Sequence, residues 1–202
     1  MLNDVPLCTL EEAVAGNGGV CLASCDAAAL SLAAGVTIPP RFQLVSLCAA
    51  ALEMAEYSPL SKLIPSQVLG IDRLNLVAAI ILYTMEDPFP FYRLVTQPLN
   101  VNGIRLKAQL INQLPYLKLL TVALRYVPRD SEYWSEKVLY RGVNIEGIPS
   151  LQEKYDHFET AFAPGVKMTF SAPTSTSTNS KVAGNFTKGI QAKFIVFTFI
   201  SS

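Results

Sequence analysis

The sequence predicts an α+β fold, with a helical region over residues 41–130 and a strand-rich region over residues 131–202. Three observations lead to this prediction. Apolar residues of the first region recur at helical spacing, those of the second form short runs of β-branched and aromatic residues, and the pattern changes near residue 130. Helices that precede strands, rather than alternating with them, are typical of this fold class. Residues 1–40, which include AGNGG and alanine-rich stretches, are expected to form an N-terminal arm.

The helical region is expected to hold three helices. Pro40 and Pro59 bracket the first, and Asp72 can cap the second, which should end before EDPFPF because proline cannot continue a helix. Pro115 lies inside the third pattern, so we expect a kink or two shorter helices there. The apolar stripes comprise Leu44, Leu47, Cys48, Ala51, Leu52 and Ala55, then Leu76, Ala79, Ile80 and Tyr83, and then Leu106, Leu110, Leu114, Leu117, Leu120 and Leu124.

The strand-rich region is expected to contain strands at residues 137–140, 167–170 and 193–200. The last, KFIVFTFI, is apolar at successive positions, as in a central strand that is covered on both faces. Between the last two strands, Asn179 can cap a short helix. Its inner face would be Val182, Ala183 and Phe186.

Composition excludes several classes of function. The chain has 16 Lys+Arg and 16 Asp+Glu. It therefore lacks the excess of basic residues that would favour nucleic acid or an anionic membrane as the main partner. The longest purely apolar run, Leu76–Tyr83, is too short to span a bilayer, and the N-terminus lacks the basic segment of a signal peptide. We therefore expect a soluble, cytoplasmic protein.

All four cysteines fall in the first quarter of the chain, which is not the distribution of a disulfide framework. Cys21 and Cys25 are four residues apart, but a zinc site would lack partners because His157 is the only histidine. We expect thiols in a reducing compartment and no metal.

Charge is unevenly distributed near the C-terminus. Residues 161–202 contain no Asp or Glu and four lysines. This local excess suits an anionic ligand such as a phosphate, and lysines that merely aid solubility are the alternative.

A run of hydroxyl side chains, Ser175-Thr176-Ser177, joins the expected strand at 167–170 to the expected helix. In extended geometry Ser175 and Ser177 would share one side and Thr176 the other, so one side can face a cleft. Turn and capping chemistry is the alternative explanation.

The second polar feature is an arginine at the end of an apolar strand, in the sequence Leu139-Tyr140-Arg141-Gly142. A guanidinium offers a planar fork that matches pyrophosphate, and Gly142 allows a ligand to approach the backbone closely. The alternative is a structural ion pair of Arg141 with Glu136 or Glu146.

Taken together, these blocks resemble the mono-ADP-ribosyltransferases of the arginine-serine-glutamate class, which transfer ADP-ribose from NAD to arginine. An apolar-Tyr-Arg-Gly strand is followed by FSAPTSTS, a short helix and an apolar strand, in the order of the family's first two signature blocks. The preceding segment AAIILYTMEDPFPFYRLVTQPLN also resembles the family's helical segment. The resemblance covers roughly residues 70–200 and implies a mixed β-sheet or sandwich core around an NAD cleft.

The resemblance implies a role for each matching residue. Arg141 would contact the NAD phosphates and the nicotinamide ribose, and Gly142 would offer backbone groups to the nicotinamide carboxamide. Ser175 would support the ribose, and Thr176 and Ser177 would hold the strand and turn that orient it. The implied reaction uses NAD as co-substrate without a metal, releases nicotinamide and modifies a protein acceptor, with arginine as the expected side chain.

The sequence departs from the family at the third block, a Glu-x-Glu that would supply the catalytic carboxylate. No Asp or Glu follows Glu159. Two interpretations remain: a fragment whose last strands and glutamate lie beyond Ser202, or a degenerate relative that holds NAD or a protein partner without catalysis. Use of Glu146 or Glu153 instead is chemically possible, but the family does not support it.

Overall fold

The computed structural model describes residues 2–16, 20–25, 27, 37–100, 104–128, 139–143 and 195–199 of the 202-residue chain. Residues 97–100, 104–110 and the two C-terminal strands are described by their backbone alone. The chain divides into two compact units, residues 1–129 and 130–202. This division falls beside the change of pattern that the sequence places between residues 130 and 131.

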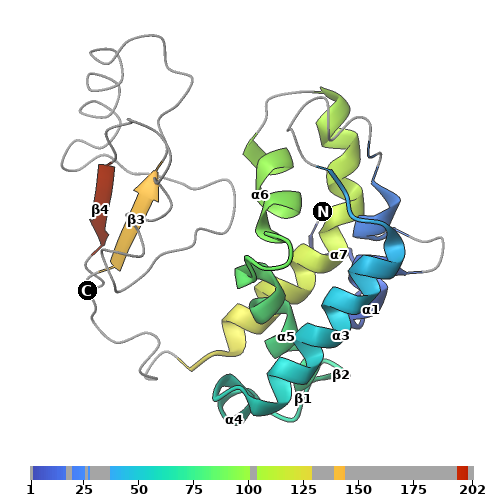
Figure 1. Ribbon diagram of the computed structural model, residues 1–202. Coiled ribbons are helices and arrows are strands. Elements are labelled where there is room, and N and C mark those ends of the chain that lie inside the picture. The colour runs from blue at the N-terminus through green and yellow to red at the C-terminus, as the bar shows by residue number, and fades with distance from the viewer. Residues whose placement is uncertain are drawn as a thin grey trace. The chain divides into compact units, whose positions relative to one another are not determined.

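The first unit is a bundle of helices with one small hairpin (Figure 1). Helix α5 contacts α1, α3, α6 and α7, so it lies at the centre of the packing. The elements are α1 (Leu10–Ala15), the 3₁₀ helix η1 (Leu22–Ser24), α3 (Arg41–Tyr57), α4 (Leu60–Leu63), β1 (Gln67–Val68), β2 (Ile71–Asp72), α5 (Arg73–Thr84), α6 (Tyr92–Asn100) and α7 (Ile104–Tyr126).

Helices α3 and α5 confirm the first two helices expected from the sequence. Pro40 and Ser58 flank α3, and its predicted apolar face is buried except for Leu52, which is partly buried. The Asp72 carboxylate accepts a hydrogen bond from the Leu74 N–H at 2.7 Å, which caps α5. Helix α5 is almost wholly apolar because other helices surround it.

The third expected helix is α7, a single helix that continues through Pro115. Proline has no N–H, so the Ile111 carbonyl loses its usual partner four residues on. The neighbouring residue Asn112 ties this part of the helix to η1, because its side-chain amide donates to the Ser24 carbonyl at 3.1 Å.

The segment expected to be an arm contributes α1 to the core of the first unit. Thr9 and Glu12 form a capping box at its start, and Leu10, Ala13 and Val14 are fully buried. The Arg41 side chain donates from Nε to the Ala15 carbonyl at 2.6 Å, which joins the end of α1 to the start of α3. The α1 part of residues 1–40 therefore packs as part of the bundle.

A hydrogen bond from a side-chain amide links helices α6 and α7. Pro98 lies in α6 and cannot donate to the Leu94 carbonyl, which the Gln113 amide nitrogen reaches instead at 3.0 Å. Gln113 is fully buried, and its Oε1 has no hydrogen-bond partner among the described residues. One helical turn further, Tyr116 packs edge-to-face on Phe91 and donates to the Ala79 carbonyl at 2.8 Å.

The second unit contains a two-stranded antiparallel sheet of β3 (Leu139–Val143) and β4 (Ile195–Phe199). Strand β3 overlaps the first predicted strand at Leu139 and Tyr140 and continues to Val143, and β4 lies within the last predicted strand. Among the described residues β4 pairs with β3 alone, so the second neighbour expected of a central strand is not seen there. The expected strand at 167–170 and the helix after Asn179 lie outside the described residues.

The described structure is therefore mainly helical with small antiparallel sheets, compatible with the α+β class predicted from the sequence. Within the same residues, no helix combines the length and the apolar character that crossing a bilayer would require.

Candidate functional site

The arginine block of the sequence lies on strand β3, in the ladder with β4. Arg141 stands opposite Phe197 in the register, and Gly142 stands opposite Val196. The strand that carries the Tyr-Arg-Gly block is thus paired with the KFIVFTFI strand, although Phe197 lies 56 positions after Arg141 along the chain. The pairing brings two of the sequence blocks together in one element of structure.

Gly142 occupies an interior position of this five-residue strand. Glycine weakens a strand interior, so it is found where another group approaches the backbone closely. The contact with the nicotinamide carboxamide inferred for Gly142 stays a prediction.

The hydroxyl block, Ser175-Thr176-Ser177, lies outside the described residues. The alternative partners of Arg141, Glu136 and Glu146, lie there as well, as does Glu153. The expectation that the Arg141 and Ser175 side chains contact the same NAD molecule therefore stays a prediction.

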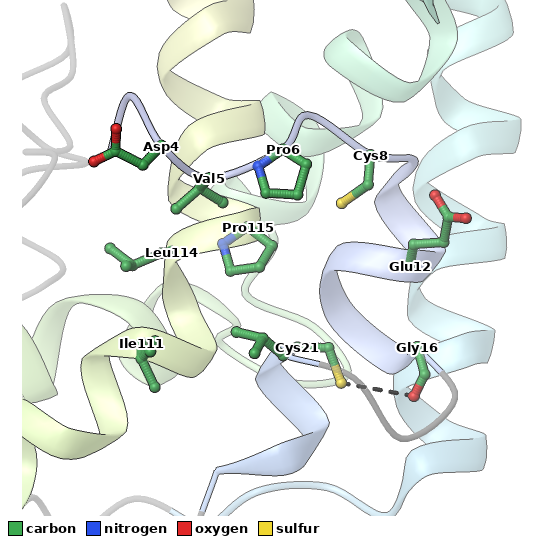
Figure 2. A pocket seen from close by; sticks show the side chains of 11 residues that line it. Asp4, Val5, Pro6, Cys8, Glu12, Gly16, Cys21, Ile111, Leu114 and Pro115 are labelled. Atoms are coloured by element: carbon green, nitrogen blue, oxygen red, sulfur yellow. Dashed lines mark hydrogen bonds between the residues drawn. The ribbon is translucent and has the colours of Figure 1, made fainter. Parts of the chain in front are cut away.

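The first unit holds a pocket that the sequence did not indicate. Figure 2 shows it between the N-terminal segment, α1 and the part of α7 around Pro115. Its volume is about 490 Å³, within the range of small-molecule sites. Its lining is mainly apolar and includes Val5, Pro6, Leu114 and Pro115. The one sequence signal near it is the proline inside α7, a residue at which helices commonly bend.

Two polar side chains that line this pocket, Glu12 and Cys21, already form hydrogen bonds within the protein. Glu12 accepts hydrogen bonds from the Thr9 backbone N–H and hydroxyl, both at 2.9 Å. These bonds lower the pKa of the Glu12 carboxyl. Cys21 lies 3.2 Å from the Ser24 hydroxyl and donates weakly to the Gly16 carbonyl at 3.6 Å. The pocket therefore offers shape and apolar contact rather than reactive groups.

All four cysteines remain thiols. Burial is the main cause that raises the pKa of Cys8, and it raises the pKa of Cys25 and Cys48 to about 12. These three side chains stay protonated at neutral pH and are poor nucleophiles. Within the part of the chain that the structure describes, no three His, Cys, Asp or Glu side chains gather into a possible metal site.

Comparisons with protein-family models, with curated proteins and with solved structures found no match for this chain. The functional interpretation consequently rests on the residues of the two sequence blocks.

Proposed function

We propose that the chain is a mono-ADP-ribosyltransferase-like protein that binds NAD through its second unit and transfers ADP-ribose to a protein side chain, with arginine as the expected acceptor. The observation that carries the proposal is the order of blocks in the sequence. Tyr140-Arg141-Gly142 precedes Ser175-Thr176-Ser177, and the apolar strand KFIVFTFI follows both.

The pairing of β3 with β4 supports this proposal. The proposal places the arginine block and the last apolar strand in one NAD-binding core, and Arg141 and Phe197 are partners in one ladder. The proposal further requires additional strands that complete a mixed sheet around an NAD cleft.

The chemistry assigned to these residues is electrostatic. Cleavage of the bond between ribose C1′ and nicotinamide passes through an oxocarbenium-like state, as in glycoside hydrolysis. Arg141 would bind the pyrophosphate through its planar fork, which fixes NAD for reaction. Gly142 would receive the nicotinamide carboxamide on its backbone, Ser175 would hold the ribose, and Thr176 and Ser177 would position Ser175.

The four lysines among residues 161–202 add to this proposal, because their positive charge is unopposed by Asp or Glu in the same segment. Such a field would favour a dianionic pyrophosphate. The remainder of the chain carries the compensating acidic residues, so the net charge of zero does not argue against this local effect.

The second candidate is a relative that binds NAD, or a protein partner, without catalysis. The two candidates differ in the source of the catalytic carboxylate: residues 160–202 contain no Asp or Glu, and Glu146 and Glu153 precede the hydroxyl block. Without a carboxylate, positive charge on the ribose would lack its main stabilising group.

Isothermal titration calorimetry with NAD, together with a nicotinamide-release assay, tests the proposal. We expect saturable binding, and we expect Arg141→Ala to weaken it about tenfold to a hundredfold, as for lost charge-assisted hydrogen bonds. Arg141→Lys should lie between the two because it keeps the charge and loses the fork. Arg125→Ala, an exposed arginine at the end of α7, is the matched control and should bind like the unaltered chain.

The assay separates the two candidates. Release of nicotinamide with labelling of an acceptor protein supports the transferase, and binding without release supports the non-catalytic relative. If release is observed, Glu146→Gln and Glu153→Gln determine whether either residue supplies the carboxylate. Binding of NAD that is unchanged in Arg141→Ala contradicts the role of Arg141 in NAD binding, with or without catalysis.

A further inference from the structure

Part of the apolar lining of the pocket in the first unit remains in contact with solvent. Val20 is 53% exposed and Ile111 is 54% exposed, although both residues line the pocket. Leu114 and Pro115 of α7 and Val5 of the N-terminal segment extend this apolar surface (Figure 2). A ligand with an apolar body would remove this surface from water, and such burial is a main source of affinity in small-molecule sites.

The α7 side of the pocket carries a backbone carbonyl that lacks its usual helical partner. Ile111 and Pro115 are four residues apart and both line the pocket, so the face of α7 between them borders it. Because Pro115 has no N–H, it cannot donate a hydrogen bond to the Ile111 carbonyl. A ligand with a hydrogen-bond donor can therefore use this oxygen as an acceptor.

Other polar groups at the pocket are acceptors as well. The Gly16 carbonyl accepts a weak hydrogen bond from the Cys21 thiol at 3.6 Å. Asp4 and Glu12 contribute carboxylates, and the described residues of the lining include no Lys, Arg or His. A ligand that supplies N–H donors and positive charge complements these groups, whereas an anionic ligand would meet like charge.

The two carboxylates differ in how far their charge is compensated. Hydrogen bonding is the main cause that lowers the pKa of each carboxyl, so both are ionised at neutral pH. The Lys118 ammonium offsets part of the Asp4 charge. The groups that lower the pKa of Glu12 are the uncharged backbone and hydroxyl of Thr9. We therefore expect Glu12 to contribute most to the negative potential at the pocket.

We propose that this pocket binds a small amphipathic amine, whose apolar body packs against Val5, Leu114 and Pro115 and whose ammonium group donates to the Ile111 carbonyl. The negative potential of the two carboxylates favours the ammonium, which stays protonated at neutral pH because its ordinary pKa is close to that of lysine, about 10.4. The site is independent of the proposed NAD site, because NAD is anionic and is assigned to the second unit.

Isothermal titration calorimetry of the full chain with dodecylamine and with dodecanoate, below their critical micelle concentrations, tests the proposal. The two probes share one alkyl chain and differ in the sign of their charge. We expect saturable binding of dodecylamine, and a dissociation constant at least about tenfold higher for dodecanoate. Absence of saturable dodecylamine binding, or equal affinity for the two probes, would overturn the proposal.

Two substitutions on α7 locate the bound probe. Leu114 is half-buried and lines the pocket, so Leu114→Trp should fill part of the volume and raise the dissociation constant of dodecylamine at least about tenfold. Leu124→Trp is the matched control, because Leu124 is 39% exposed on the same helix and does not line the pocket. Helical circular dichroism verifies that both variants fold. Equal binding by the two variants contradicts the assignment to this pocket.

A third substitution tests the contribution of charge. Glu12→Gln removes the negative charge and keeps a residue that suits the capping box of α1. Because Glu12 is exposed, we expect dodecylamine binding to weaken by only about two- to fivefold. Dodecanoate should bind no more weakly than before, so the preference for the amine narrows. An unchanged preference contradicts the role given to Glu12.

Protection of a thiol provides a readout at the pocket itself. Cys8 lines the pocket and is half-buried, whereas the other three cysteines are buried. Cys8 should therefore be the first thiol that N-ethylmaleimide alkylates, as followed by mass spectrometry. Saturating dodecylamine should slow this reaction, and dodecanoate at the same concentration should leave its rate unchanged. If bound dodecylamine does not slow the alkylation of Cys8, the amine binds elsewhere and the proposal is wrong.

Discussion

The Gln113 side-chain amide donates a hydrogen bond to the Leu94 carbonyl at 3.0 Å, in place of the backbone N–H that Pro98 lacks. A proline in one helix is thus compensated by a glutamine in the next. Because Gln113 is fully buried, the bond forms where water cannot replace it.

Substitution of this glutamine should therefore destabilise the helical unit. Gln113→Leu leaves the Leu94 carbonyl buried without its donor, and we expect a loss of about 1–3 kcal/mol in the free energy of unfolding. Chemical denaturation followed by helical circular dichroism measures it. In a Pro98→Ala background the backbone N–H returns, so the same substitution should cost less than about 1 kcal/mol. Equal costs in the two backgrounds would show that Pro98 and Gln113 are not coupled.

The end of α1 requires a residue without a Cβ. A Cβ built on Gly16 would lie 2.6 Å from the Glu12 carbonyl oxygen, closer than such atoms approach in proteins. Because that neighbour is backbone and cannot rotate away, we expect Gly16→Ala to destabilise the first unit by about 1–3 kcal/mol. Thermal unfolding measures the change. A melting temperature equal to that of the unaltered chain would contradict the packing at this position.

The hairpin between β1 and β2 contains a leucine in an unfavourable conformation. Leu69 has φ of 53° and Gly70 has φ of 84°, and Leu69 is 72% exposed. Positive φ at both central residues favours Asn-Gly in such turns. Leu69→Asn should therefore stabilise the protein by about 0.5–1 kcal/mol, since little packing is lost. Gly70→Ala should do the reverse, and a stabilising Gly70→Ala would refute the turn geometry.

The capping box of α1 should make a stability contribution that depends on pH. Hydrogen bonds from Thr9 lower the pKa of Glu12 below its ordinary value of 4.5. A carboxyl with a lowered pKa in the folded state stabilises above the unfolded-state pKa, and this stabilisation is lost as the pH falls through the folded-state pKa.

Thr9→Ala should accordingly cost about 0.5–2 kcal/mol at pH 7. The cost should shrink below pH 4.5, where Glu12 begins to take up a proton in the unfolded chain. Urea denaturation of both chains between pH 3 and 7 measures the difference. The Glu12→Gln chain serves as control, because glutamine also suits this cap position and does not titrate. If the cost of Thr9→Ala instead rises towards low pH, the hydrogen bond between Thr9 and the ionised Glu12 carboxylate does not stabilise the folded state.

Much of the helical unit could be predicted from local patterns. Proline boundaries and an Asp72 cap located α3 and α5, because caps and breakers act over a few residues. The strands β3 and β4 were found from their residue types for the same reason. The packing of α1 was not foreseen, since a six-residue helix has too few turns to show a periodic stripe.

The candidate site was predictable only in part. The sequence could nominate Arg141, Gly142 and Ser175 because their chemistry belongs to each residue and its immediate neighbours. Their convergence depends on how distant segments pair, and of these the structure describes the pairing of β3 with β4 alone. The pocket beside Pro115 was missed because the residues that line it, within 4–21 and 111–115, come from two parts of the chain that are far apart in sequence.

The sequence by itself determined where helices begin and end and which faces of them are apolar, because periodicity and capping are local properties of the chain. Only the tertiary structure decided that Gln113 donates a hydrogen bond to the Leu94 carbonyl, for which Pro98 has no N–H. It also decided that α1 belongs to the core and that some apolar residues of α3 face outward. All three depend on contacts between residues that are distant in sequence. Such contacts are set by the packing of the whole unit rather than by any single segment.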